Sequence, residues 1–110
     1  MSSDADYAII DARGRAHLVS IHGEVDLSNA GAVEGQLLAR LAEGRCIVDL
    51  NGLTFIDSAG LRMLNDLGNR YRLAVVLGPQ AVVRRAIEIV GLSATIPTFP
   101  TLDEAEASFL

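Results

Sequence analysis

Two short, almost purely apolar runs, joined by a helical pattern, constrain this chain more than any other feature. The runs are Cys46–Leu50 and Leu73–Leu77. Apolar runs of this length without alternation are typical of parallel strands covered on both faces. Between them, an apolar residue recurs every three positions, as expected for one face of a helix, at Leu61, Leu64 and Leu67. These segments predict a strand, a helix from 57 to about 70, and a second strand in an α/β domain.

The residues before this unit predict two adjacent strands and a first helix. Residues 7–10 and 17–22 are short apolar stretches around a turn that contains Gly14. Apolar and polar residues alternate in the second stretch, so we expect a strand with one solvent-facing side. Ser28 is the expected N-cap of a helix that ends near Gly44. Its inner face would consist of Val33, Leu37, Leu38 and Leu41.

The remaining segments predict a loop, two more helices and a short strand. We expect a loop over 51–56 and a helix that starts at Gly78-Pro79, with proline in the first helical position, and closes at Gly91. The inner face of this helix would hold Val83, Ala86, Ile87 and Val90. Thr95 and Ile96 would form a last strand. Thr101 and Glu104 have capping-box spacing, and the helix they begin would be anchored by Leu102, Ala105 and Phe109.

This order of elements predicts an α/β fold with a mostly parallel or mixed central sheet and about four helices. A chain of 110 residues with 50% hydrophobic residues has enough apolar side chains for one shared core. We therefore expect a single domain over 1–110, in which residues 1–6 are flexible.

Composition argues against several functions. The formal net charge is −5, and the arginines are scattered, so a phosphate-binding basic face for nucleic acid is not expected. Cys46 is the sole cysteine, so an internal disulfide is impossible. We expect Cys46 to be an inert core thiol. His17 and His22 fall on opposite sides of their strand, so we expect no metal site and no cofactor. Residues 1–6 do not resemble a signal peptide, and no apolar run could span a membrane, so we expect a cytoplasmic protein.

The segment 50–61, LNGLTFIDSAGL, places a serine at a helix N-terminus beside a carboxylate. The free backbone N–H groups and the helix dipole favour an anion there, so a phosphate on Ser58 could be held. Small residues at Ala59 and Gly60 would let another backbone or a nucleotide approach closely. The alternative is structural: Asp57 or Ser58 simply caps the helix, which contributes about 1 kcal/mol.

Enzymatic interpretations of this segment fit poorly. A nucleophile elbow needs glycine two residues before the serine, where this chain has Ile56. A phosphate-binding P-loop needs a lysine, and a phospho-acceptor aspartate at Asp49 or Asp57 would also lack its cationic partner, because the chain contains no lysine. We therefore expect a binding protein without catalytic residues.

At these positions the sequence resembles the STAS domain family, and within it the bacterial anti-sigma factor antagonists. Residues 23–26, GEVD, and 53–61, LTFIDSAGL, match the two motifs of the family, and the second motif is the specific one. The resemblance implies that an anti-sigma factor, itself a serine kinase, phosphorylates Ser58. It also implies that the unphosphorylated form binds the anti-sigma factor and frees its sigma factor, until phosphorylation abolishes binding and a serine phosphatase restores it.

The resemblance also implies a partner-binding set, namely Asp26, Asp57, Ser58, Ala59 and Gly60. Asp57 would orient the serine hydroxyl or assist phosphotransfer, whereas Asp26 could equally be a turn residue. Ala59 departs from the family, where many members have a second hydroxyl. Two other roles of stand-alone relatives remain open, namely a STAS accessory subunit of a membrane transporter and a stress-complex scaffold.

Overall fold

The sheet is organised around β2, a nine-residue strand from His17 to Val25. In the computed structural model, which describes residues 6–14 and 16–109, β1 (Tyr7–Arg13) runs antiparallel along one edge of β2. On the other edge, the first half of β2 pairs in parallel with β3 (Cys46–Asp49), and the second half pairs in parallel with β4 (Leu53–Ile56). β5 (Leu73–Val76) and β6 (Thr98–Phe99) extend the sheet in the order β1-β2-β3-β5-β6. The expected mixed α/β fold is confirmed.

Gly23 marks the point where β2 changes its partner. The register shifts between Gly23 and Glu24, and Gly23 has a φ of 93°. A Cβ at this position would collide with the backbone carbonyl of Asp6. Only glycine adopts this bulged backbone without strain, so Gly23 directs the end of β2 toward β4.

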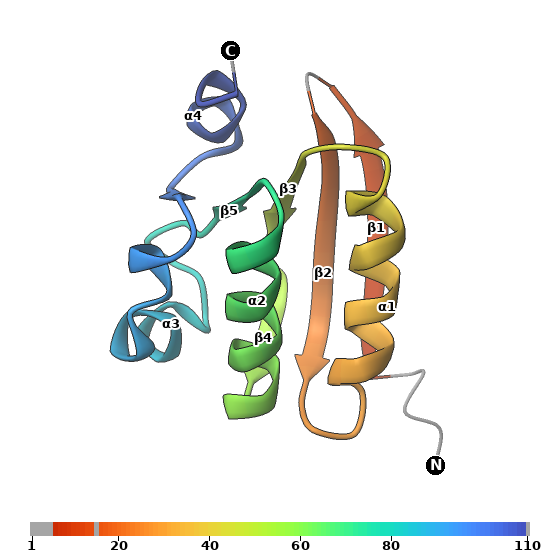
Figure 1. Ribbon diagram of the computed structural model, residues 1–110. Coiled ribbons are helices and arrows are strands. Elements are labelled where there is room, and N and C mark those ends of the chain that lie inside the picture. Colours follow the sequence, from red (N-terminus) through yellow and green to blue (C-terminus); the bar gives the residue numbers. More distant parts are fainter. Residues whose placement is uncertain (1–5, 15, 110) are drawn as a thin grey trace.

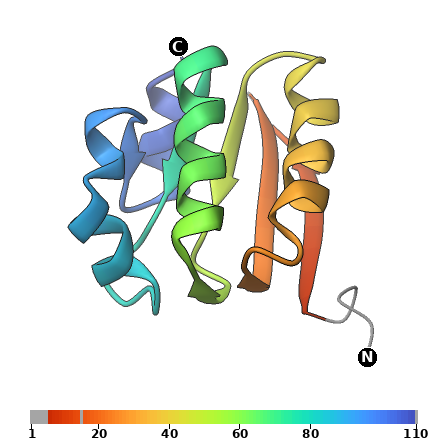
Figure 2. The same cartoon turned by 60° about the horizontal axis from the view of Figure 1, so that its bottom comes forward.

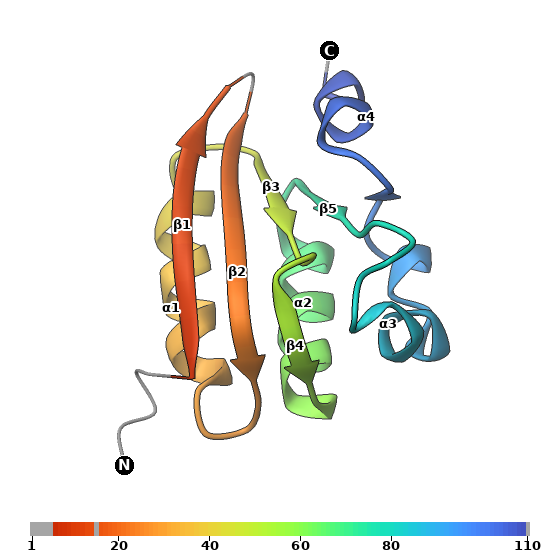
Figure 3. The same ribbon diagram turned by 180° about the vertical axis from the view of Figure 1, so that it is seen from behind.

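The helices lie on both faces of the sheet (Figures 1 and 2). α1 (Ala30–Leu41), α2 (Ser58–Arg70) and α3 (Arg84–Val90) share one hydrophobic core with one face. α4 (Leu102–Ala107) packs against the other face beside β3, β5 and β6. Seen from behind, β1, β2 and β4 lie in front, with no helix of the described chain over them (Figure 3). The helical layer is therefore continuous on one face and partial on the other.

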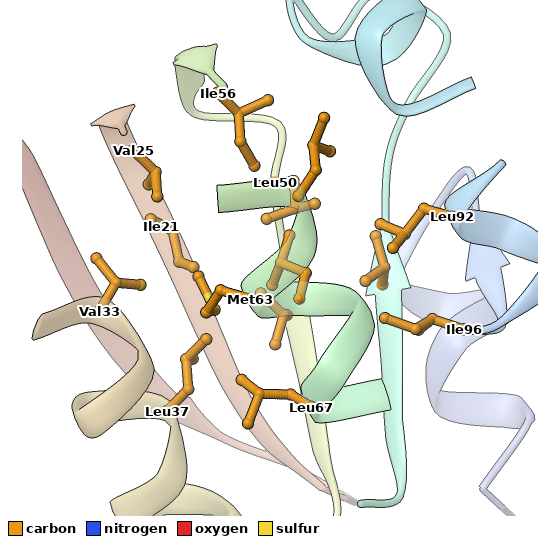
Figure 4. Packing of buried hydrophobic residues seen from close by; sticks show 14 of the residues in the cluster. Ile21, Val25, Val33, Leu37, Leu50, Ile56, Met63, Leu67, Leu92 and Ile96 are labelled. Atoms are coloured by element: carbon orange, nitrogen blue, oxygen red, sulfur yellow. The ribbon is translucent and has the colours of Figure 1, made fainter. Parts of the chain in front are cut away.

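The alternation of side chains along the central strands divides the core. Val48 and Val75 belong to the core cluster that the sheet shares with α1 and α2. Ile47 and Ala74 belong to a smaller cluster on the other face, together with Phe109 and with Ala105 of α4. In the larger core, side chains from the sheet and helices interlock (Figure 4), among them Ile21, Val25, Val33, Leu37, Met63, Leu67, Leu92 and Ile96. α2 thus lies over the centre of the sheet, which fixes the direction of its N-terminus.

The N-cap of α1 differs from the prediction. The cap is Asn29, and its side chain is buried and bonded on both sides: Oδ1 accepts from the Asp26 N–H (2.9 Å) and Nδ2 donates to the Glu24 carbonyl (2.9 Å). The Ser28 hydroxyl instead donates to Asp26. The prediction of Ser28 as N-cap was wrong, because the helix begins one residue later. The Asn29 side chain makes no cap bond to α1 and instead holds the preceding loop together.

The expected loop over 51–56 was also wrong in its second half, since Leu53–Ile56 forms β4. Leu53 and Ile56 are buried, and Phe55 is exposed. Pairing with the second half of β2 supplies the backbone partners of this strand, and that pairing depends on the Gly23 bulge. Four residues offered too short a pattern to reveal it.

The C-terminal third follows the prediction less closely. α3 begins at Arg84, five residues after Pro79, and Val90 is 53% exposed, although Gly91 closes the helix in the left-handed conformation as expected. The last strand is Thr98–Phe99, because Ile96 is used as a buried core residue. The Thr101 cap is confirmed, since its hydroxyl accepts from the Glu104 N–H (3.3 Å).

The predicted flexibility of residues 1–6 falls outside the described residues, except at Asp6. The carbonyl of Asp6 accepts a hydrogen bond from the Glu24 N–H (2.6 Å). The prediction of a domain boundary at residue 110 also lies outside that range.

Candidate functional site

The candidate site lies where β2 and β4 end, at the lower end of the molecule in Figure 1. The loop 26–29 leaves β2 there, and α2 starts directly after β4. Because both strands run in the same direction, their carboxyl ends bring Asp26 and Asp57 to the same edge of the sheet. In open α/β sheets, ligands and partners gather at such edges.

Asp57 caps α2 and fastens it to the neighbouring loop. One carboxylate oxygen accepts from the Gly60 N–H (3.0 Å), and the other accepts from the Leu27 N–H (3.0 Å). The carboxylate therefore holds two backbone groups from separate segments, and neither of these bonds involves the Ser58 hydroxyl. The role of Asp57 in orienting that hydroxyl stays a prediction.

Ser58 is the first residue of α2, and its side chain is exposed. Since Asp57 supplies the cap, the Ser58 hydroxyl has no structural task in the part of the chain that the structure describes. Of the two structural alternatives, the cap is therefore Asp57 and not Ser58. A free hydroxyl at a helix N-terminus is accessible to a modifying enzyme.

Asp26 forms a compact turn with Ser28. Its carboxylate accepts from the Ser28 N–H (2.9 Å) and the Ser28 hydroxyl (2.6 Å). The Ser28 hydroxyl, followed by the backbone N–H groups, lowers the pKa of Asp26, so this carboxylate is ionised at neutral pH. Asp26 is thus a turn residue that also keeps a negative charge at the same edge as Ser58.

Gly60 has a packing role. A Cβ there would lie 2.7 Å from Cγ1 of Ile56 and 3.0 Å from Cγ1 of Val25, so α2 sits close on the sheet because this residue is glycine. Ala59 is half-buried and packs against the same core. The atoms that come close at Gly60 are side chains of β2 and β4, so the expected approach of another backbone or a nucleotide stays a prediction. The contact of Ala59 and Gly60 with a partner also stays a prediction.

Apolar side chains that the sequence analysis did not single out flank the site. Leu27 is 81% exposed and Phe55 is 47% exposed, and both line a shallow hollow with Asp26, Ser28 and Asp57. Leu27 could have been noticed as a large apolar residue between polar turn residues. Phe55 needed the pairing of β4 to show that it points away from the core.

A second hollow lies on the other side of Ser58, between α2 and α3. Ser58, Arg62 and Asn65 form one wall, on successive turns of α2, and Val90 and Leu92 contribute to the other. This groove has no local sequence pattern because it needs α3 as a neighbour. The spacing of four between Ser58 and Arg62 was the available signal.

The other groups considered from sequence lie away from this site. Cys46 is buried, and burial raises the pKa of its thiol, consistent with an unreactive side chain. His17 pairs with Asp11 (2.7 Å) near the β1–β2 hairpin. Among the described residues, no cluster of His, Cys, Asp or Glu could hold a metal ion, and no helix is long and apolar enough to cross a membrane.

Comparison with known proteins identifies the family. The STAS domain model matches residues 7–105. The anti-sigma-F factor antagonist RsfB of Mycobacterium tuberculosis is 33% identical over 102 residues, which cover 88% of this chain and 83% of the relative. An anti-sigma factor antagonist from Mycobacterium paratuberculosis, solved by crystallography, superposes with a TM-score of 0.83 at 29% identity, covering 98% of this chain and 97% of that chain.

A more distant structure shares the fold. SpoIIAA in its unphosphorylated form superposes with a TM-score of 0.66 at 18% identity, covering 93% of this chain and 96% of that protein. The match over residues 7–105 includes both motifs and the whole sheet. The chain therefore belongs to the STAS domain family, among the anti-sigma factor antagonists.

Proposed function

We propose that this protein binds an anti-sigma factor in its unphosphorylated form, and that phosphorylation of Ser58 by that partner, a serine kinase, abolishes binding. Binding frees the sigma factor, and a serine phosphatase restores the active form. The single observation that carries the proposal is the exposed Ser58 hydroxyl, left free at the start of α2 because Asp57 makes the cap. Such a role belongs in the cytoplasm, where sigma factors work.

The relatives support the identity of the partner. RsfB is named an anti-sigma-F factor antagonist, and the crystallographic relative is named an anti-sigma factor antagonist. SpoIIAA, which shares the fold, has been solved in an unphosphorylated and in a phosphorylated form. A phosphate-controlled antagonist is therefore the function that fits the site and the relatives together.

The surface around Ser58 suits reversible docking. Leu27 and Phe55 offer apolar area that a partner can bury, while the remainder of the rim is polar. A phosphate would add about 1.5 to 2 negative charges near the side chains of Asp26 and Asp57. Desolvating that charge in an interface opposes docking. A change of about 3 kcal/mol would weaken binding roughly a hundredfold, which is enough to redirect the partner.

The partner can be identified and the acceptor mapped in one series. Ser58→Ala serves as bait in a native lysate, and a captured protein with a serine-kinase domain is then purified. With ATP, this kinase should phosphorylate the wild-type protein at position 58, as located by mass spectrometry. Ser28→Ala is the matched control, because it removes another exposed hydroxyl of the same edge. Phosphate at Ser28 in place of Ser58 would refute the proposal.

The docking surface is tested separately. Leu27→Ser and Phe55→Ser should each weaken binding to the anti-sigma factor about tenfold, because each removes exposed apolar area that the partner would cover. Ile10→Ser is the control, since Ile10 is 56% exposed on β1. Isothermal titration calorimetry measures the three affinities. Equal losses for Ile10→Ser and Phe55→Ser would contradict a docking surface at this edge.

A further inference from the structure

The groove between α2 and α3 places a cation one helical turn beyond Ser58. Ser58, Arg62 and Asn65 face this groove, and Val90 and Leu92 lie across it. Arg62 is exposed, and within residues 6–14 and 16–109 no carboxylate lies within ion-pair distance of its guanidinium. The guanidinium of Arg62, one helical turn from the Ser58 hydroxyl, therefore has no ion-pair partner among the described residues.

The neighbouring carboxylates do not compete strongly for Arg62. Asp57 is held by the N–H groups of Gly60 and Leu27. On α3, Glu88 pairs with Arg84 (3.1 Å). Asp66 lies one turn further along α2 and makes no ion pair with Arg62. The guanidinium is thus available to an anion that arrives at Ser58.

Helix geometry directs Arg62 toward that anion. Side chains four residues apart are neighbours on a helix surface, and helical side chains lean toward the N-terminus, which here is toward Ser58. A guanidinium binds phosphate through two parallel N–H donors. The phosphate would also be close to the positive end of the α2 dipole.

We infer that Arg62 captures the phosphate attached to Ser58 and holds it in the α2–α3 groove. The inference rests on the proposed modification of Ser58 and adds to it an internal receptor for the phosphate. The anion is covalently attached, so the groove needs no affinity for a free ligand. Phosphorylation then creates an ordered charged surface beside the exposed Val90.

The test uses full-length protein in which phosphoserine is incorporated genetically at position 58, so that no kinase is needed. Phosphorus NMR measures the second pKa of the phosphate in this protein and in its Arg62→Gln and Arg85→Gln variants. Arg85 is an exposed arginine on α3 that does not line the groove, so its replacement makes the same change in charge.

We expect the phosphate pKa to rise by about 0.3 units in Arg62→Gln, because the bound cation favours the dianion. It should stay unchanged in Arg85→Gln, and Arg62→Lys should restore part of the difference. The Nε–H signal of Arg62 should also shift on phosphorylation. Equal pKa values in the wild type and Arg62→Gln would overturn the capture. The proposed function would fail in a different way, if the phosphorylated protein still bound the anti-sigma factor.

Discussion

Asp57 and Ser58 are adjacent in the sequence but have separate tasks in the structure. The carboxylate of Asp57 satisfies the N–H groups of Gly60 and Leu27. The hydroxyl of Ser58 is thereby left unused and exposed. This separation lets the serine change its charge without removing a cap, which is what a reversible switch at a helix end requires.

Because Asp57 caps α2, replacing its side chain should lower the stability of the protein. Asp57→Ala should lower the free energy of unfolding by about 1 to 2 kcal/mol, because one cap and one tie to the 26–29 loop are lost together. Urea unfolding followed by circular dichroism measures this. Asp66→Ala, an exposed change on the same helix, should stay within about 0.5 kcal/mol. Similar stabilities of both variants would contradict the assignment.

The interactions of Asp11 with Arg40 and His17 should make a pH-dependent contribution to stability. Its hydrogen bonds to the Arg40 guanidinium, and then to His17, hold the pKa of Asp11 well below its ordinary value. A lowered folded-state pKa stabilises the protein above the unfolded pKa, about 4, and this contribution disappears as the pH falls further. Because the Asp11 side chain is 41% exposed, the effect should stay below about 1 kcal/mol.

The comparison of wild type with Asp11→Asn measures that contribution. The wild type should be the more stable of the two in urea at pH 7, and the difference should shrink between pH 4 and pH 2. Added salt should reduce it at pH 7, since exposed charges are screened. A difference that is the same at pH 7 and pH 2 would show that the carboxylate charge is not its source.

At the scale of the elements, β2 decides the position of the site. Its bulge at Gly23 turns the strand from β3 toward β4, and β4 then delivers Asp57 and Ser58 to the end of the sheet. The backbone of Gly23 has a positive φ and lies against the Asp6 carbonyl. A local feature of one residue therefore sets the distance between the two loops that form the site.

Two glycine replacements should have opposite effects. Gly23→Ala should destabilise the protein by about 1 to 3 kcal/mol, because alanine adds strain at positive φ and a clash with Asp6. Gly35→Ala should stabilise it by up to about 1 kcal/mol, since Gly35 lies in α1 with no atom near the added methyl group. Thermal unfolding of both variants provides the comparison. A neutral Gly23→Ala would refute the proposed role of the bulge.

Sequence patterns predicted those elements whose signals are local. The buried strands, the start of α2 and the Thr101 cap follow from runs of five residues or from capping chemistry. β4 was missed because it gains its hydrogen bonds from a distant strand. The position of Asn29 was missed because its side chain bonds to the Glu24 carbonyl, which only the folded loop brings near.

Only the part of the site that lies in the sequence motif was predictable. The motif located Ser58 beside a carboxylate, and the structure supplied the division between cap and free hydroxyl. The outward direction of Phe55 and the groove beside Arg62 required the packing of β4 and α3, whereas Leu27 has a local signal as an apolar residue between polar turn residues. Exposure of a particular apolar side chain depends on which face its neighbours cover, and one sequence does not carry that information.

At the scale of the whole molecule, the proposed phosphorylation site is separate from the core. The apolar core lies between the sheet and its helices, whereas Ser58 and the rim around it lie at one end (Figure 4 and Figure 1). A phosphate at Ser58 therefore displaces no buried side chain. The proposed change in binding state would therefore leave the fold unchanged.

This separation predicts that the two Ser58 replacements are equally well folded but differ in binding. Ser58→Ala and Ser58→Asp should unfold within about 0.5 kcal/mol of the wild type. Ser58→Asp should bind the anti-sigma factor more weakly, whereas Ser58→Ala should bind it and resist inactivation. Denaturation and calorimetry on the same samples measure both properties. Equal affinities of the two variants would argue against electrostatic control.

The sharpest test of phosphate control is the affinity of the anti-sigma factor for the protein before and after stoichiometric phosphorylation at Ser58. Calorimetry on both forms, with circular dichroism to confirm an unchanged fold, should show a dissociation constant about a hundredfold higher for the phosphorylated form. Equal dissociation constants for the two folded forms would contradict the central claim that a phosphate on Ser58 controls binding.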